Sequence, residues 1–538
     1  MNTTPPTRAV TAAAGPTPDA AQLRAILIAV SLALMAVIAS MTGLNVAQTQ
    51  MAVEFGASQH TILWIINIYT MTLAALLLPL GAIGDRLGRK PMLIAGLGVF
   101  GIANIVAGFA PGAEVMIGSR VAAGIGAAMI MPITLAVITS TFPEEQRGKA
   151  IGIWTGVAGG GGILGMFLSA LLVDIADWRW LFVLPIVLVL AALATALPAV
   201  PNSRELPRHG FDTAGALLSV PAVAGLIFVL QEGPERGWTA PATLFGLAAG
   251  LLGTFGFVAW ELRRRDGALL DVRLFGQRGL AGGSLTLLVA FGVQAGIAVV
   301  LFPFFQAVLG WSGLGATLAQ LPMALAMMIV SGLAPGLVER IGTRATMAIG
   351  IALSGAGLAQ MAVFATVDGG YLSILPGLVA MGIGMGFAMA PATHAITGSL
   401  PPGEQGVASA LNDVTREFGA ALGMALLGAL VATGYRNSVD GKLDGIAPET
   451  AEIARVGVAN AVDIAHTAGD QGPLLIRAAQ ESFVAGWQQS MWVGVAVMAG
   501  LLVYILVFGP KNVRTEPGPV RVPERSPSDG TPKSDELL

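Results

Sequence analysis

Cysteine is absent from this chain of 538 residues, and charged residues are scarce. Without cysteine the chain can form no disulfide, no cysteine-based metal site and no cysteine nucleophile. The four histidines show no zinc-ligand spacing, and the sequence contains no P-loop and no Ser/His/Asp arrangement. We therefore expect no cofactor, no metal site and no enzymatic activity. The net charge of −3 also argues against a nucleic-acid partner.

Apolar residues dominate what is present. They make up 54% of the chain, the mean hydropathy is +0.75, and only 11% of residues are charged, against about 25% in a soluble domain. A helix that crosses the bilayer needs roughly 20 apolar residues. Fourteen stretches meet this requirement, and together they predict an all-α membrane protein. They lie at 25–45, 60–80, 91–110, 115–137, 149–172, 178–199, 213–231, 240–260, 279–302, 312–335, 345–365, 371–396, 406–432 and 487–508.

Positive charge predicts the orientation of these spans. Lys and Arg gather in the loops after even-numbered spans, and such residues accumulate on the cytoplasmic side. An even number of spans places both termini on that same side. Residues 1–22 lack the pattern of a signal peptide, and they are expected, with 511–538, to form disordered cytoplasmic tails. The expected location is the plasma (inner) membrane of a bacterium.

A weak internal repeat indicates two similar halves. GDRLGRK at 84–90 has an echo in VERIGTR at 338–344, and each copy ends a predicted span on the cytoplasmic side. Duplicated halves around a midplane binding site are a common transporter plan. The spacing predicts a six-helix half at 25–199, a linker with two additional helices at 200–277, and a second six-helix half at 278–508. Within the second half, the polar segment 433–486 is predicted to form an extracytoplasmic helical hairpin.

The loop after the second span, GAIGDRLGRK at 81–90, has a physical logic of its own. Its glycines allow a tight turn and close helix contact; they are Gly81, Gly84 and Gly88. Asp85 can cap or pair with a neighbouring helix end. The basic residues of the loop are Arg86, Arg89 and Lys90. They can pair with acids on the same face, of which Glu144 and Glu145 are the nearest candidates. The alternative is an ordinary positively charged cytoplasmic loop.

This loop resembles one found in the major facilitator superfamily, where it follows the second helix and acts as a conformational latch. Other segments resemble the fourteen-helix drug:H⁺ antiporter branch of that family, which includes multidrug and quaternary ammonium exporters. They are GSRVAAGIGAAMIMP (118–132), WRWLF (178–182), FDTAGALL (211–218), LQEGPERGW (230–238), LLDVRLF (269–275), LFPFFQAVLGWS (301–312) and SALNDVTREFGAALGMALLGA (409–429). The resemblance covers nearly all of 25–508 and implies a major-facilitator fold with alternating access.

Two departures from the branch concern proton coupling. Its first helix usually carries an acid in Asp-x-Thr-x-x-Asn-Val-Ala, and here that position is Ser40. An intramembrane carboxylate is the natural proton carrier and cation partner. Its loss therefore weakens both the inference of proton coupling and the inference of cationic drug substrates. In the fifth span the Gly-Pro-x-x-Gly-Gly element of the antiporters is replaced by residues 165–170, which lack the Pro and both later Gly.

The candidates for coupling are therefore other intramembrane polar residues. The resemblance ties Arg120 to coupling, the alternative being an Arg that snorkels to the membrane surface. Asp413, Arg416 and Glu417 share one helix face. An acid beside an Arg is normally kept ionised, which favours a latch in which Arg416 could pair with Asp85. Glu417 and His394 could instead carry protons, or His394 could be a polar residue satisfied by backbone.

Polar and aromatic residues in the middle of spans are candidates for a substrate cavity, although each could instead serve helix packing. They are Ser40, Asn45, Trp64, Asn67, Tyr69, Trp154, Gln294, Gln306 and Asn412. Such a cavity is apolar, aromatic and poor in acids, and it suits a lipophilic, neutral or weakly charged substrate.

The sequence thus favours a secondary active multidrug exporter of lipophilic compounds, coupled to proton influx. An exporter of lipids or hydrophobic metabolites with weak or absent coupling is the alternative. The expected partners are a small lipophilic substrate or lipid, protons and the bilayer, and we expect a monomer. An enzyme or a receptor is the contrasting class. The glycine run at 156–162 lacks the following Lys-Ser/Thr of a phosphate loop.

Overall fold

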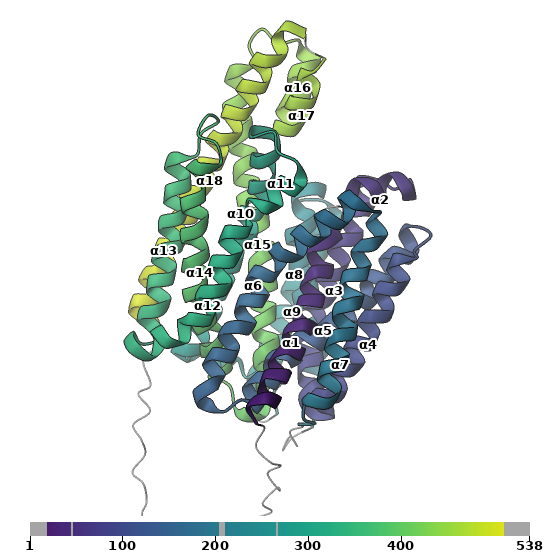
Figure 1. Cartoon of the computed structure of the whole chain (residues 1–538), viewed down its shortest axis with the longest axis vertical. Coiled ribbons are helices and arrows are strands. Elements are labelled where there is room, and N and C mark those ends of the chain that lie inside the picture. The colour runs from purple at the N-terminus through teal and green to yellow at the C-terminus, as the bar shows by residue number, and fades with distance from the viewer. Residues whose placement is uncertain (1–18, 45–46, 204–209, 265–266, 468, 511–538) are drawn as a thin grey trace, which may run out of the picture.

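The computed structural model describes residues 19–44, 47–203, 210–264, 267–467 and 469–510, and all regular elements in these ranges are helical. Fourteen of the described helices are long and apolar enough to cross a membrane, which confirms the predicted all-α membrane fold. Figure 1 shows them as two groups side by side, the N-terminal helices in purple to blue and the C-terminal helices in green to yellow.

The N-terminal group contains six long helices and one short one. Asp19 and Ser58 cap two of them by accepting hydrogen bonds from the backbone N–H of Gln22 (2.7 Å) and Thr61 (3.2 Å). The helices are α1 (Ala20–Gly43), α2 (Gln48–Phe55), α3 (Gln59–Leu87), α4 (Arg89–Gly108), α5 (Ala113–Thr141), α6 (Glu144–Ile175) and α7 (Val183–Ala199), with a 3-10 turn at Trp178–Phe182 before α7.

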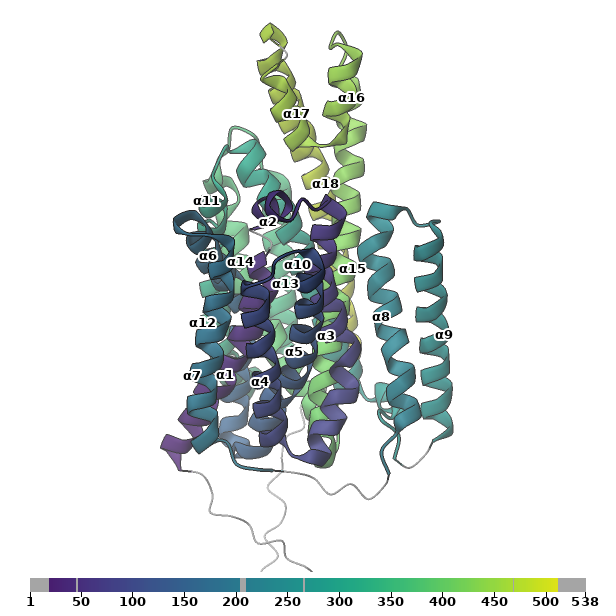
Figure 2. The ribbon, with the colours of Figure 1, turned by 90° about the vertical axis from the view of Figure 1, so that its right-hand side faces the viewer.

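Two additional helices, α8 (Thr213–Arg236) and α9 (Pro241–Arg263), follow the first group. They cross at glycines: a Cβ on Gly225 would lie 2.7 Å from the carbonyl oxygen of Gly246. Figure 2 shows the pair standing outside the main bundle, beside α3 and α15, with which α8 is in contact. α8 therefore packs against one helix of each main group.

The C-terminal group contains the remaining long helices. Its tenth predicted span, 312–335, is interrupted, because the chain turns at Gln320 just before Pro322, a residue that lacks a backbone donor. The helices are α10 (Arg278–Pro303), which continues into a π-turn at Phe304–Val308, α11 (Gly313–Leu318), α12 (Leu321–Ile341), α13 (Thr343–Phe364), α14 (Leu375–Thr397), α15 (Gln405–Val439) and α18 (Gly472–Phe508).

The molecule has two distinct faces across its long axis. The start of α1 and the end of α18 lie on one face, here called the terminal face, and the short helices α16 (Pro448–Val456) and α17 (Val458–Ala465) project from the opposite, hairpin face (Figure 1). The last two spans are longer than predicted, since α15 continues beyond 432 and α18 begins at Gly472 rather than 487. Hydropathy misses these extensions because paired polar residues carry the helices beyond the apolar stretch.

Both copies of the internal repeat form the same corner. Gly88 joins α3 to α4 with φ of 112°, and Gly342 joins α12 to α13 with φ of 88°. L side chains rarely adopt this backbone region, so glycine is required at each corner. The amide of Gly88 donates to Gly84 O at 3.1 Å, and the amide of Gly342 donates to Val338 O at 2.8 Å. The sequence repeat therefore corresponds to a structural repeat.

Candidate functional site

A cavity of about 180 Å³ lies between the two groups of helices. Its wall comes from α1, α5 and α6 on one side and from α10, α12, α15 and the α11–α12 turn on the other. The lining residues are Val37, Ile38, Met41, Thr42, Met131, Ala158, Gly159, Gly162, Ile163, Met166, Phe291, Gln294, Ala295, Ala298, Leu301, Gln320, Met323, Arg416, Glu417 and Ala420. Most of this surface is apolar, and its four methionines are flexible and polarizable enough to fit differently shaped ligands.

Glu417 supplies the carboxylate of this cavity. Its side chain is half-buried on α15, and it makes no hydrogen bond or ion pair to another described residue. An ionised carboxylate in an apolar wall is costly unless a cation or a proton compensates it. The site can therefore hold a proton or a cationic group at this position.

Arg416, the neighbour of Glu417, is paired with a different acid. Its Nη1 lies 3.2 Å from Asp413 Oδ1, and its guanidinium lies over the rings of Phe291 (4.4 Å) and Trp154 (5.5 Å). The expected alternative, a pair between Arg416 and Asp85, is wrong. Asp85 contacts the first turn of α15, and ten residues of helix, roughly 15 Å, separate Gly406 from Arg416.

Arg120 on α5 is almost completely buried, with 1% of its surface exposed, which excludes snorkelling. It donates from Nη1 to Ser40 Oγ (2.9 Å) and from Nη2 to Ser40 O (3.1 Å), and its guanidinium lies 4.1 Å from the centre of the Tyr69 ring. Ser40 in turn donates to Asn104 Oδ1 at 3.1 Å. No described carboxylate forms an ion pair with Arg120, so these contacts alone offset its desolvation.

Of the residues predicted to line the cavity, Gln294 does so, and Asn45 lies outside the described residues. Ser40 and Tyr69 instead hold Arg120, as described above. Trp154 donates to Thr134 Oγ1 at 3.0 Å, and Asn412 donates to Asp413.

Three further candidates also lie away from the cavity lining. Trp64 packs against Phe228 of α8, and Gln306 is exposed in the π-turn. Asn67 is half-buried on α3. In this structure Trp64 joins two helices, a role to which polar and aromatic residues within spans are also suited.

Sequence reasoning missed several residues of the cavity wall. Gln320 is fully buried at the break between α11 and α12, where its Nε2 donates to Ala316 O at 3.2 Å. A lone Gln followed by Leu-Pro inside an apolar span was a usable signal for such an interrupted helix. The methionines of the cavity wall could not be identified from the sequence, because Met also occurs in closely packed helix interfaces.

The loop at 81–90 closes the two groups together at the terminal face. Asp85 accepts a hydrogen bond from the backbone N–H of Gly406 (2.8 Å) and pairs with Arg89 on its own side (3.0 Å). A carboxylate at the start of α15 is favoured by the partial positive charge of that helix end. Gly81 allows the contact, since a Cβ there would lie 2.7 Å from Gly406 O.

The rest of this loop contacts the N-terminal half and the segment that leads into α8. Lys90 Nζ donates to Leu197 O at 2.6 Å, and Arg86 lies 5.3 Å from the ring of Phe211. Gly84 lies against Ile133 of α5. The predicted partners Glu144 and Glu145 make no ion pair among the described residues, because the first turns of α6 face the C-terminal group.

A second seam joins α6 to α12. Ser331 Oγ donates to Gly152 O at 2.8 Å, and a Cβ on Gly160 would lie 2.9 Å from Ala324 O. The glycine-rich fifth span thus permits close packing against the opposite half. Both seams lie between the cavity and the terminal face, so the structure is closed toward that face.

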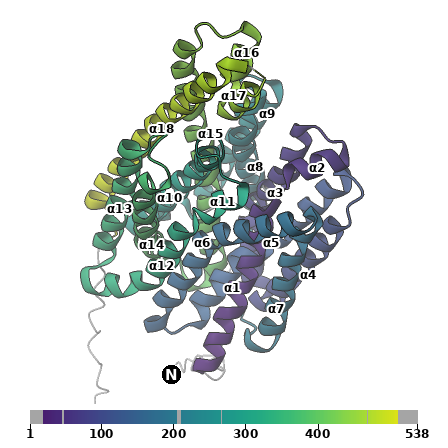
Figure 3. The ribbon, with the colours of Figure 1, turned by 45° about the horizontal axis from the view of Figure 1, so that its top comes forward.

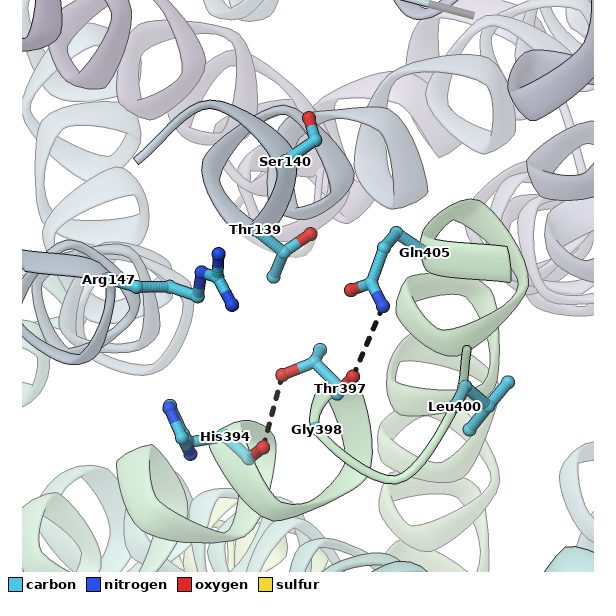
Figure 4. A pocket seen from close by; sticks show the side chains of 8 residues that line it. All are labelled: Thr139, Ser140, Arg147, His394, Thr397, Gly398, Leu400 and Gln405. Atoms are coloured by element: carbon cyan, nitrogen blue, oxygen red, sulfur yellow. Dashed lines mark hydrogen bonds between the residues drawn. The ribbon is translucent and has the colours of Figure 1, made fainter. Parts of the chain in front are cut away.

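His394 lies in a different hollow, a pocket of about 390 Å³ at the terminal face (Figure 4). The pocket is walled by the ends of α5 and α14 and the starts of α6 and α15. Its lining residues are Thr139, Ser140, Arg147, His394, Thr397, Gly398, Leu400 and Gln405. The structure therefore separates His394 from the other coupling candidates Arg120, Asp413 and Glu417.

The paired halves, the cavity between them and the two repeated corners have the architecture of a membrane transporter. Residues 28–424 match the Major Facilitator Superfamily, and the chain belongs to that family. This agrees with the resemblance carried by the sequence motifs.

Relatives of this chain carry names that refer to drug resistance or export. Multidrug resistance protein Stp of Mycobacterium tuberculosis (strain CDC 1551 / Oshkosh) is 29% identical over 501 residues, covering 91% of this chain and 92% of the relative. Cephamycin export protein CmcT of Amycolatopsis lactamdurans is 32% identical over 400 residues, covering 73% and 82%. The crystal structure of a bacterial homolog of the human lysosomal transporter Spinster, inward-facing and unoccupied, has a TM-score of 0.57 at 17% identity and covers 91% of this chain and 97% of that one. This likeness shows the shared fold.

Proposed function

We propose that this protein exports lipophilic compounds across the plasma membrane by alternating access, driven by proton influx. The observation that carries the proposal is the methionine-lined cavity between the halves, whose free carboxylate is Glu417. An apolar, adaptable wall with few polar groups suits lipophilic cargo of variable shape. The name of the relative CmcT, a cephamycin export protein, supports an export function, and the name of Stp, a multidrug resistance protein, supports drugs as cargo.

The terminal face is the cytoplasmic face in this proposal, because Lys and Arg gather in its loops. The structure, closed toward that face, then represents a state in which cargo no longer reaches the cavity from the cytoplasm. Both termini are cytoplasmic, and the protein works as a monomer in the bilayer.

In this proposal Glu417 couples proton influx to cargo export. A proton arriving from outside neutralises the carboxylate and displaces cargo, and release of the proton toward the cytoplasm restores the site for the next molecule. Arg416 stays with Asp413, so Glu417 alternates between proton and cargo without an internal counter-ion in direct contact.

The alternative is export of lipids or hydrophobic metabolites with weak coupling. The observation favouring it is Ser40, which leaves Arg120 without a carboxylate that could exchange protons. The alternative differs in one measurable respect, because substrate would then move without a matching proton flux.

Transport assays in proteoliposomes with an internal pH dye distinguish proton-coupled export from export with weak coupling. We expect lipophilic substrates to move with an opposing pH change, and we expect Glu417→Gln to abolish the pH change and concentrative transport. Glu452→Gln, an exposed change on α16, is the matched control and should leave both intact. Transport without any pH change would support the alternative, and full coupled transport by Glu417→Gln would exclude Glu417 as the coupling residue.

A further inference from the structure

The pocket that contains His394 is lined mainly by polar and basic residues that have no role in the proposed export cycle. Figure 4 shows the guanidinium of Arg147 and the ring of His394 together on one side of it, with Thr139, Thr397 and Gln405 around the remainder. No Asp or Glu lines the pocket. Glu144 on the first turn of α6 is exposed and lies outside this lining.

Most polar groups around the pocket are already satisfied by nearby backbone. The hydroxyl of Thr139 donates to Ala136 O at 3.1 Å, and that of Thr397 donates to Thr393 O at 3.1 Å. The amide nitrogen of Gln405 donates to Pro401 O at 3.2 Å. These side chains therefore shape the wall and leave hydrogen-bond donation into the pocket to other groups.

Arg147 and His394 are those groups. The Nε–H of Arg147 is buried and has no acceptor, and Nη2 makes one long contact of 3.4 Å with Phe142 O. The ring of His394 makes no hydrogen bond to another described residue, and its surface is exposed to the pocket. A buried N–H without an acceptor is rare, because leaving it unpaired is costly.

We propose that this pocket binds a small phosphate-bearing anion, held by the guanidinium of Arg147 and the imidazole of His394. A guanidinium presents its donors as a planar fork that matches phosphate oxygens. The pocket volume of about 390 Å³ accommodates a phosphate monoester as well as inorganic phosphate. The phosphate group is shared by soluble phosphate esters and lipid headgroups, and the test separates these sources.

The anion would also bridge the two halves. Arg147 belongs to α6 of the N-terminal half, and His394 belongs to α14 of the C-terminal half. A ligand that contacts both residues binds only while the terminal face is closed, so it stabilises that state relative to the open one. The pocket is thus a site at which the phosphate content of its surroundings regulates transport.

The test uses the full chain in phosphatidylcholine nanodiscs, with thermal unfolding measured in sodium phosphate and in sodium chloride of equal ionic strength. We expect phosphate to raise the unfolding temperature in a saturable manner. Arg147→Gln should raise the half-saturating phosphate concentration at least tenfold, and His394→Gln should raise it severalfold. Lys149→Gln, an exposed change two residues further along α6, is the matched control and should not alter it.

A second arm uses nanodiscs that contain phosphatidylglycerol, without added phosphate. Stabilisation there that Arg147→Gln removes assigns the site to lipid headgroups, whereas stabilisation by inorganic phosphate in phosphatidylcholine assigns it to soluble phosphates. Equal unfolding temperatures in all conditions, or a phosphate effect that survives in Arg147→Gln, would overturn the proposal.

The conformational claim has its own readout, which remains valid if a variant is less stable. Ser331→Cys introduces a thiol, in a chain otherwise free of Cys, at the buried α6–α12 seam. Phosphate should slow maleimide labelling of this thiol severalfold in the parent background and leave it unchanged with Arg147→Gln. Faster labelling in phosphate would contradict the stabilisation of the closed state.

Discussion

Two arginines in the membrane interior are held in different ways, and the difference bears on selectivity. Arg416 forms an ion pair with Asp413, whereas Arg120 relies on Ser40, a backbone carbonyl and the face of Tyr69. A hydrogen bond to a charged group is worth roughly 1.5–3 kcal/mol, but it does not cancel the positive charge as a carboxylate does. The first half of the transporter therefore carries a buried positive charge near its cavity.

Ser40→Asp is expected to neutralise this charge and favour cationic cargo. One unit charge acts on another about 10 Å away with roughly 1.7 kcal/mol at an effective dielectric constant of about 20, more than a tenfold change in binding. Transport of a monovalent lipophilic cation relative to a neutral analogue should rise by about that factor. Ser40→Asn, which adds a similar volume without charge, is the control. An unchanged ratio in Ser40→Asp would make this position irrelevant to selectivity.

At the scale of helices, the closed state depends on two crossings that glycine makes possible. α3 meets the start of α15 at Gly81 and Gly406, and α6 meets α12 at Gly152 and Ser331. A Cβ on Gly81 would lie 2.7 Å from Gly406 O, and a Cβ on Gly152 would lie 2.5 Å from Ser331 O, so neither glycine can be replaced without a shift. Both seams must separate for the terminal face to open, so their strength sets the balance between the two states.

Asp85→Asn should weaken the first seam. The variant keeps the size of the side chain but loses the negative charge beside the start of α15 and the ion pair with Arg89. A loss of about 1–2 kcal/mol changes the ratio of closed to open states by a factor of roughly 5–30. We expect transport to fall about tenfold with expression and substrate binding intact. Asp444→Asn, exposed on the hairpin face, is the control, and full transport by Asp85→Asn would contradict the latch.

Gly81→Ala should open the same seam by steric means. The added Cβ would lie 2.7 Å from Gly406 O, and such overpacking costs about 1–3 kcal/mol. Maleimide labelling of the Ser331→Cys reporter should become severalfold faster. Gly332→Ala adds the same methyl group to a helix at a position where no atom of another helix lies within 4 Å of it, and it should leave the labelling rate unchanged. Equal rates in the two variants would show that the Gly81 crossing does not control opening.

At the scale of the whole molecule, sequence was most informative where hydrophobicity alone decides the outcome. The fourteen spans and the repeat at Gly88 and Gly342 follow from apolar length and from the need for glycine at a corner. The cavity wall could not be obtained in this way, because helix rotation depends on packing between distant spans. Gln294 and Gln306 look alike in the sequence, yet the first lines the cavity and the second is exposed in the π-turn.

The proposed orientation of the molecule is testable with two matched substitutions. Asn202 follows α7 at the terminal face, and Asn437 lies in the last turns of α15 at the hairpin face; both are exposed. In intact cells a membrane-impermeant maleimide should label Asn437→Cys and not Asn202→Cys, and permeabilisation should make the second accessible. The absence of native cysteine removes background. The reverse pattern would invert the proposed orientation, and labelling of both in intact cells would contradict the fourteen-span topology.

The hairpin face offers a practical advantage for imaging. α15 and α18 continue without a break from the bundle into the projection seen in Figure 3, where α16 packs against α15 and α17 packs against α18. Within the projection, Tyr435 donates to Ala454 O at 2.7 Å and Arg455 pairs with Asp440 at 2.7 Å. On α18, Arg477 pairs with Asp368 at 2.6 Å. An antibody fragment raised against this projection would be coupled stiffly to a helix that carries Glu417. It would serve as an alignment marker for electron microscopy of a small particle, and its tilt would report the movement of α15 during transport.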